Sequence, residues 1–82
     1  MEERKGRSIY NRPLRCVKKT VIGVKTFNSI YDQGVIVDGD IYRLPGRIKM
    51  EEFEIGATYF FQTVDLKIPF RPIQIEDYIK TN

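Results

Sequence analysis

The sequence predicts a small all-β domain, or a β domain with one short helix, and three observations support this prediction. Runs rich in Val, Ile, Thr and aromatic residues, which favour strands, recur along the chain between turn residues. Asp38-Gly39 separates two β-branched runs, which is a strong hairpin signal because Gly accepts a positive φ and Asp tolerates one. A length of 82 residues is typical of a single domain with a small core. Together they favour a barrel of about five strands, and OB-like and SH3-like barrels both fit this size.

The first 13 residues are predicted to form a flexible basic arm, and residues 14–82 the small β-barrel domain. The arm shows no periodicity and ends at Asn11-Arg12-Pro13, where the residue before proline avoids the helical conformation. Residues 1–19 carry seven basic and two acidic side chains, whereas residues 20–82 carry seven basic and nine acidic ones. This charge suits a phosphate-binding element, although a solvated tail has the same composition.

The first strand is expected within residues 14–27, which are rich in Val, Thr and Ile. Its apolar residues change parity near Val21 and Ile22, and a one-residue bulge at Gly23 explains the change. A long, bent strand of this kind serves both sheet layers of a small barrel. With the bulge, the side chains expected to face outward are Lys18, Thr20 and Lys25.

The next two strands are expected to form the hairpin around Asp38-Gly39. A two-residue turn sets the pairing as Ile36 with Ile41, Val35 with Tyr42 and Gly34 with Arg43. Both faces of residues 34–37 are apolar, which indicates either a strand covered on both sides or a binding face on the outside. Pro45-Gly46 marks a second reversal, after which residues 47–50 are expected to continue as a short strand.

The clearest strand is expected over residues 57–67. Phe60, Val64 and Leu66 share one parity, with Gln62 as the exception, and are predicted to face the core. The opposite parity then leaves Tyr59 and Phe61 outside. The two prolines of residues 68–72 indicate an edge or a crossing segment, and residues 72–76 alternate as a last strand, followed by a helical turn over residues 77–80.

The composition argues against an enzyme. The chain has no histidine and one cysteine, Cys16, which excludes an intrachain disulfide, a Cys/His zinc site and histidine-dependent catalysis. Its glycines lack the spacing of a phosphate-binding loop, and its acidic pairs have no evident partner. We therefore expect no catalytic residue, no metal and no cofactor. The chain also lacks a secretory h-region and an apolar run of roughly 18 residues, so a cytoplasmic location without a membrane partner is expected.

Nucleic-acid binding, most plausibly of single-stranded DNA or RNA, is the first functional prediction. Proteins of this kind combine a positive groove with aromatic faces on which bases stack. The candidate binding residues are basic side chains of the arm and strands together with two aromatic side chains: Arg4, Lys5, Arg7, Lys18, Lys25, Arg43, Arg47, Lys49, Tyr59 and Phe61. The competing interpretation of Tyr59 and Phe61 is that they cover a second small core under the C-terminal segment.

The alternative prediction is a protein-interaction module, such as an accessory subunit or inhibitor encoded by a phage or mobile element. The short chain, the exposed aromatics and a strand edge near Pro69 suit this function. Self-association into a homo-oligomer through that edge is its simplest form. The two functions differ in salt dependence, because bound phosphates release counterions and nucleic-acid binding then weakens steeply with added salt.

Overall fold

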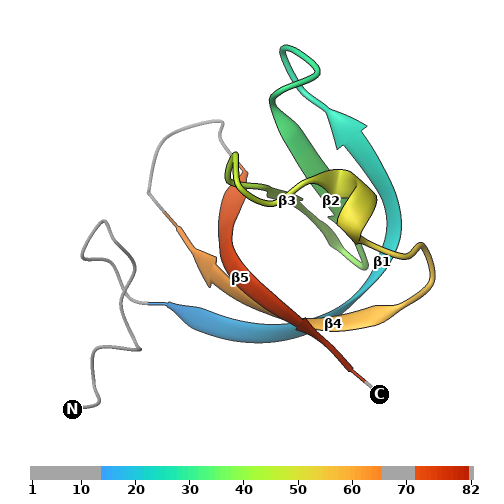
Figure 1. Ribbon diagram of the computed structural model, residues 1–82. Helices are drawn as coiled ribbons and strands as arrows, with labels where there is room; N and C mark the ends of the chain where they lie inside the picture. The colour runs from blue at the N-terminus through green and yellow to red at the C-terminus, as the bar shows by residue number, and fades with distance from the viewer. Residues whose placement is uncertain (1–13, 66–71, 82) are drawn as a thin grey trace.

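Five strands and one short 3-10 helix form within residues 14–65 and 72–81, the parts of the chain that the computed structural model describes (Figure 1). In chain order they are β1 (Arg15–Thr26), β2 (Gln33–Val37), β3 (Asp40–Arg43), η2 (Met50–Glu52), β4 (Thr58–Val64) and β5 (Ile73–Lys80). The prediction of an all-β fold with about five strands is confirmed. No helix of the described residues is long and apolar enough to cross a membrane. The predicted basic arm, residues 1–13, lies outside the described residues.

The sheet closes on itself in the order β1-β2-β3-β5-β4, because β1 pairs with β2 through one half and with β4 through the other. The register shifts between Val21 and Gly23, which confirms a bulge in this strand, with Ile22 and not Gly23 as the residue without a partner on β2. The bulge lets one bent strand serve both sides of the barrel. The β3–β5 pair is parallel and the other neighbours are antiparallel. Every described strand therefore has two neighbours, and the edge expected near Pro69 lies outside the described residues.

The hairpin of β2 and β3 has the predicted register. Ile36 pairs with Ile41, Val35 with Tyr42 and Gly34 with Arg43. Gly39 has a φ of 83°, the left-handed conformation that the Asp-Gly turn requires. Local turn chemistry is therefore sufficient to set this part of the barrel.

The placement of Tyr59 and Phe61 outside the barrel was wrong. Tyr59 is 2% exposed and Phe61 is fully buried, whereas Phe60, assigned to the core, is 41% exposed. The inward face of β4 carries Tyr59 and Phe61, whose rings pack with Phe53, and the backbone N–H of Glu54 donates a hydrogen bond to the Tyr59 hydroxyl at 2.8 Å. The remaining core side chains come from all five strands and the β3–β4 connector: Val21, Val35, Val37, Tyr42, Leu44, Ile48, Val64 and Ile75.

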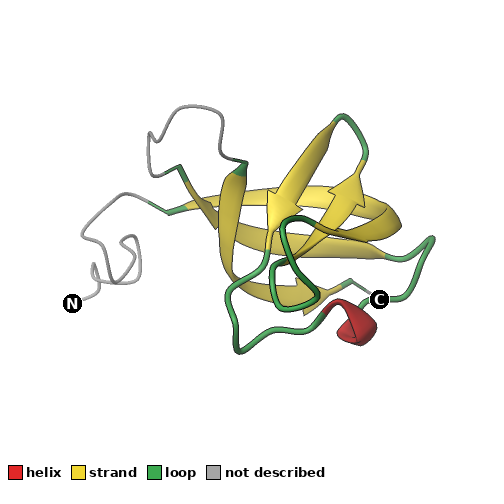
Figure 2. Cartoon of the chain, turned by 90° about the horizontal axis from the view of Figure 1, so that it is seen from above, coloured by secondary structure: helices red, strands yellow, loops and turns green. Residues whose placement is uncertain are grey.

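The connector between β3 and β4 covers one end of the barrel. Figure 1 shows η2 across the opening, and Figure 2 shows it beyond the strands at that end. Residues 47–50 form turns here and not the expected short strand. Leu44, Ile48 and Phe53 of the connector are buried in the core. The connector therefore closes this end of the barrel with apolar side chains.

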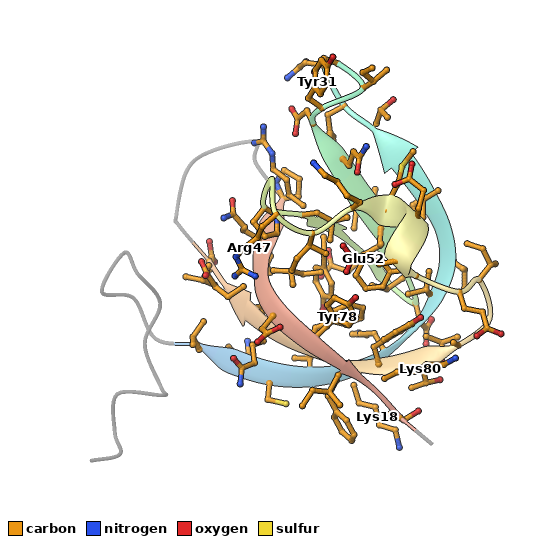
Figure 3. All side chains as sticks on the ribbon, viewed as in Figure 1. Lys18, Tyr31, Arg47, Glu52, Tyr78 and Lys80 are labelled. Atoms are coloured by element: carbon orange, nitrogen blue, oxygen red, sulfur yellow. The ribbon has the colours of Figure 1, made fainter. Side chains whose placement is uncertain are left out.

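Polar contacts tie the connector to β5, which runs to Lys80 as a strand in place of the expected helical turn. The Tyr78 hydroxyl donates a hydrogen bond to Glu52 at 2.5 Å, and Figure 3 shows the two side chains converging. This bond to a carboxylate raises the pKa of Tyr78 to about 12. The pKa of Glu52 is lowered, first by the hydrogen bond that it accepts from the Lys49 backbone N–H and second by the bond from Tyr78. Lys80 donates to Glu54 at 2.5 Å.

Candidate functional site

The outer face of the β2–β3 hairpin carries the ring of Phe27, which is seated on Gly34. Gly34 and the buried Val35 are neighbours in β2 and face opposite sides of the sheet, so a side chain at position 34 would point out of the barrel. A Cβ on Gly34 would lie 2.7 Å from Cε2 of Phe27 and 2.7 Å from the Tyr42 carbonyl oxygen. The Phe27 backbone N–H donates to the Asp32 carbonyl at 2.7 Å, which closes the loop behind the ring. Glycine is therefore needed for this close approach.

Two cations flank the Phe27 ring. Lys25 pairs with Gly34 from β1, and Arg43 pairs with it from β3, so both side chains lie on the same outer face. Lys25 Nζ lies 5.0 Å from the ring centroid of Phe27, and Arg43 Cζ lies 5.8 Å from it. Both separations are within the range of cation–π attraction. The strand register thus brings Arg43 of β3 to the aromatic ring and the lysine at the end of β1.

Asp32 holds Arg43 in one orientation. Arg43 Nε donates to Asp32 Oδ1 at 2.8 Å, and Nη2 donates to Oδ2 at 2.7 Å. The two side chains are only 24% and 15% exposed. Bidentate pairs of this geometry are strong and directional. The guanidinium is therefore fixed beside the ring.

Two adjoining shallow pockets meet at Phe27, and we call them together the Phe27 groove. The apolar pocket is lined by Phe27, Ile36, Val37, Gly39, Asp40, Ile41 and Pro72. The polar pocket is lined by Lys25, Thr26, Phe27, Asn28, Asp32, Arg43 and Pro72. The groove thus offers a mainly apolar surface on one side and hydrogen-bonding groups on the other.

The β1–β2 loop extends past the groove and ends in exposed apolar side chains. Tyr31 is 83% exposed and Ile30 is 67% exposed. Figure 3 shows Tyr31 at the tip of this loop, at the end of the molecule opposite Lys18. The tip therefore adds an aromatic ring that contacts solvent.

Of the basic residues predicted from the sequence, the structure brings Lys25 and Arg43 together. Lys18 lies elsewhere, with its Nζ 5.7 Å from the Phe60 ring centroid. Arg47 of the connector donates to the Glu76 carbonyl, and the exposed Lys49 precedes η2. Tyr59 and Phe61 are core residues, and the arm residues Arg4, Lys5 and Arg7 lie outside the described part of the chain. The predicted set is therefore not one continuous surface.

Phe27 and Asp32 were not among the binding residues predicted from the sequence. One signal for Phe27 was present, because a glycine inside a strand marks a bulge or a close approach, and Gly34 was predicted to pair with Arg43. The ion pair of Asp32 has no comparable local signal, since Arg43 follows it by eleven residues.

Comparisons of the chain with protein-family models, with curated proteins and with solved structures give no match in any of the three. The geometry of the Phe27 groove is therefore the basis on which a function can be assigned.

Proposed function

We propose that this chain is a small non-enzymatic nucleic-acid-binding protein and that the Phe27 groove binds single-stranded DNA or RNA. The observation that carries the proposal is the Phe27 ring, placed between an apolar and a polar pocket and beside two cations. A nucleobase has a flat apolar face and a polar edge, and it is attached to an anionic backbone. Base stacking on an aromatic side chain contributes about 1–3 kcal/mol.

The topology supports an OB-type barrel. The OB-fold is a five-stranded Greek-key barrel that binds oligonucleotides on the face of its second and third strands and through the loop between the first two. The described strands close in one ring with a parallel β3–β5 pair, and β1 is long and bent. The Phe27 groove lies on the β2–β3 face, and Tyr31 belongs to the β1–β2 loop.

The charges of the groove predict a modest affinity for nucleic acids. Asp32 offsets the charge of Arg43, so Lys25 is the principal cation of the groove for contact with a phosphate. The logarithm of the affinity for a single strand falls with the logarithm of salt concentration with a slope of about −0.7 for each phosphate neutralised. We therefore expect a slope of roughly −1 from the groove, made steeper by any contact of the basic arm.

The test is fluorescence anisotropy of labelled mixed-sequence oligonucleotides, single-stranded and duplex, in a salt series with the full chain. Phe27→Leu keeps an apolar side chain on Gly34 and removes the aromatic face. It is expected to lower the affinity for a single strand by about five-fold or more, because one base loses its stacking contact with an aromatic ring. The matched control is Phe60→Leu, because Phe60 is also a partly exposed ring beside a lysine, but on the outer face of β4.

Two results would contradict the proposal. One is the absence of oligonucleotide binding by the wild-type chain at low salt. The other is an equal loss of affinity in Phe27→Leu and Phe60→Leu, which would indicate binding without a defined site. Thermal denaturation of each variant separates loss of binding from loss of folding.

A protein-binding function is the second candidate, and exposed apolar side chains outside the groove favour it. Ile79 on β5 is 71% exposed, and Ile22 in the β1 bulge is 60% exposed. Association through apolar side chains depends little on salt, whereas phosphate binding at Lys25 weakens with the slope given above and more steeply if the basic arm contributes. The salt series therefore distinguishes the two functions.

A further inference from the structure

We propose that Arg43, held by Asp32, selects the base that stacks at Phe27 and favours bases that present two neighbouring hydrogen-bond acceptors. This inference rests on the proposed function, because it concerns the specificity of the same groove. The bases with such an edge are guanine, through O6 and N7, and cytosine, through O2 and N3.

The Asp32 pair leaves one edge of the Arg43 guanidinium available. A guanidinium has five N–H donors in a rigid plane. Asp32 accepts from Nε and Nη2, so among residues 14–65 and 72–81 the hydrogen bonds of the guanidinium lie along this one edge. The remaining donors of Nη1 and Nη2 therefore form a second fork, directed away from Asp32. Arg43 lines the polar pocket next to Phe27, where the edge of a stacked base would lie.

A fixed two-donor fork distinguishes bases by their edges. Arginine binds guanine O6 and N7 in this way, whereas adenine places a donor beside its N7 acceptor. In a single strand the Watson–Crick edge is also accessible, and there cytosine presents two adjacent acceptors. Thymine and uracil place an N–H donor between their two carbonyl groups, so they cannot satisfy both donors of the fork.

The Asp32–Arg43 pair is suited to selectivity more than to affinity. Its opposite charges largely cancel at long range, which limits attraction to phosphates in general. The short bonds also keep the guanidinium in place before binding, so little side-chain entropy is lost when a base arrives. By contrast, Lys25 has a flexible side chain with a single charged group, which can contact a phosphate at any position of the sequence.

The experiment compares single-position variants of one oligonucleotide. A labelled oligothymidylate of about 12 nucleotides, within the usual site size of an OB barrel, carries thymine, adenine, cytosine or guanine at its central position. Anisotropy titrations with the full chain measure the four affinities. The oligonucleotides with a central guanine or cytosine are expected to bind about five-fold more tightly, or better, than those with adenine or thymine.

Two variants test the role of the pair. Arg43→Lys keeps the charge and removes the fork, so the four affinities are expected to become equal. Asp32→Asn removes the negative charge, so we expect tighter binding of all four oligonucleotides, a steeper salt dependence and weaker discrimination. The matched control is Arg15→Lys, because Arg15 is exposed on β1 where that strand pairs with β4, away from the groove. Thermal denaturation verifies that each variant is folded.

The outcomes separate this inference from the function on which it rests. If the wild-type chain binds no oligonucleotide, the proposed function fails and this specificity fails with it. If it binds all four oligonucleotides equally, or if Arg43→Lys keeps the preference, only the base-selection role is refuted.

Discussion

Replacing Gly34 by alanine is expected to destabilise the barrel and to disturb the Phe27 groove at the same time. The new Cβ would lie 2.7 Å and 2.9 Å from two carbons of the Phe27 ring and 2.7 Å from the Tyr42 carbonyl oxygen. Non-bonded carbon atoms are optimally separated by about 3.5–4.0 Å, so the neighbours must move by roughly 1 Å. The ring can swing outward, but the carbonyl belongs to β3, which is held against β2 by the strand ladder.

The expected cost follows from this overlap. Inserting a methyl group into a packed site costs about 1–3 kcal/mol in free energy of unfolding. For a domain of this size, each kcal/mol lowers the melting temperature by roughly 4–8 °C. Gly34→Ala should therefore melt about 4–24 °C below the wild-type chain, as measured by circular dichroism. Oligonucleotide affinity should fall as well, because the displaced ring no longer lies between the two pockets.

Gly23→Ala is the matched control for this prediction. A Cβ there would meet Ile36 Cδ1 at 3.5 Å, an ordinary contact, and neither glycine has a positive φ. Alanine at such a position stabilises by about 0.4–1 kcal/mol through the unfolded chain, or is close to neutral. If Gly34→Ala proved as stable as Gly23→Ala and bound oligonucleotides normally, the seating of Phe27 on Gly34 would be refuted.

Two further predictions concern the core and the connector. Phe61→Ala removes a fully buried ring whose centroid lies 5.5 Å from that of Tyr42 in an edge-on arrangement. The free energy of unfolding, measured by urea denaturation, should fall by about 3–5 kcal/mol. Wild-type stability in this variant would show that the ring lies outside the barrel. The pKa of Tyr78 is raised from 10.0 to about 12, so its bond to Glu52 contributes stability that is present below pH 10 and lost as the pH rises towards 12. Tyr78→Phe should abolish that part of the alkaline loss of stability. Urea denaturation at several pH values between 10 and 12 measures it, and the same pH dependence of the urea midpoint in the wild-type chain and in Tyr78→Phe would show that the bond does not form.

A part of the groove was predictable from the sequence. Lys25 and Arg43 were assigned to binding, and the hairpin register that places Arg43 opposite Gly34 was predicted correctly. Phe27 and Asp32 were not, because their roles depend on contacts between segments. The ring of Phe27 is brought over Gly34 by the pairing of β1 with β2, and no periodicity within residues 14–27 records that contact.

The sequence by itself determined the features that depend on neighbouring residues. Asp38-Gly39 specifies a turn because few residues other than glycine tolerate its φ, and the parity change near Val21 and Ile22 requires a bulge because successive strand residues face opposite sides. Only the tertiary structure decided which face of β4 is buried. Both of its faces carry large apolar side chains, so the choice depends on the space between β1, β5 and the connector, which Tyr59 and Phe61 fill. The Phe27 groove was decided in the same way, since the pairing of β2 with β1 and with β3 brings Arg43 to the ring of Phe27 and to its near neighbour in sequence, Lys25.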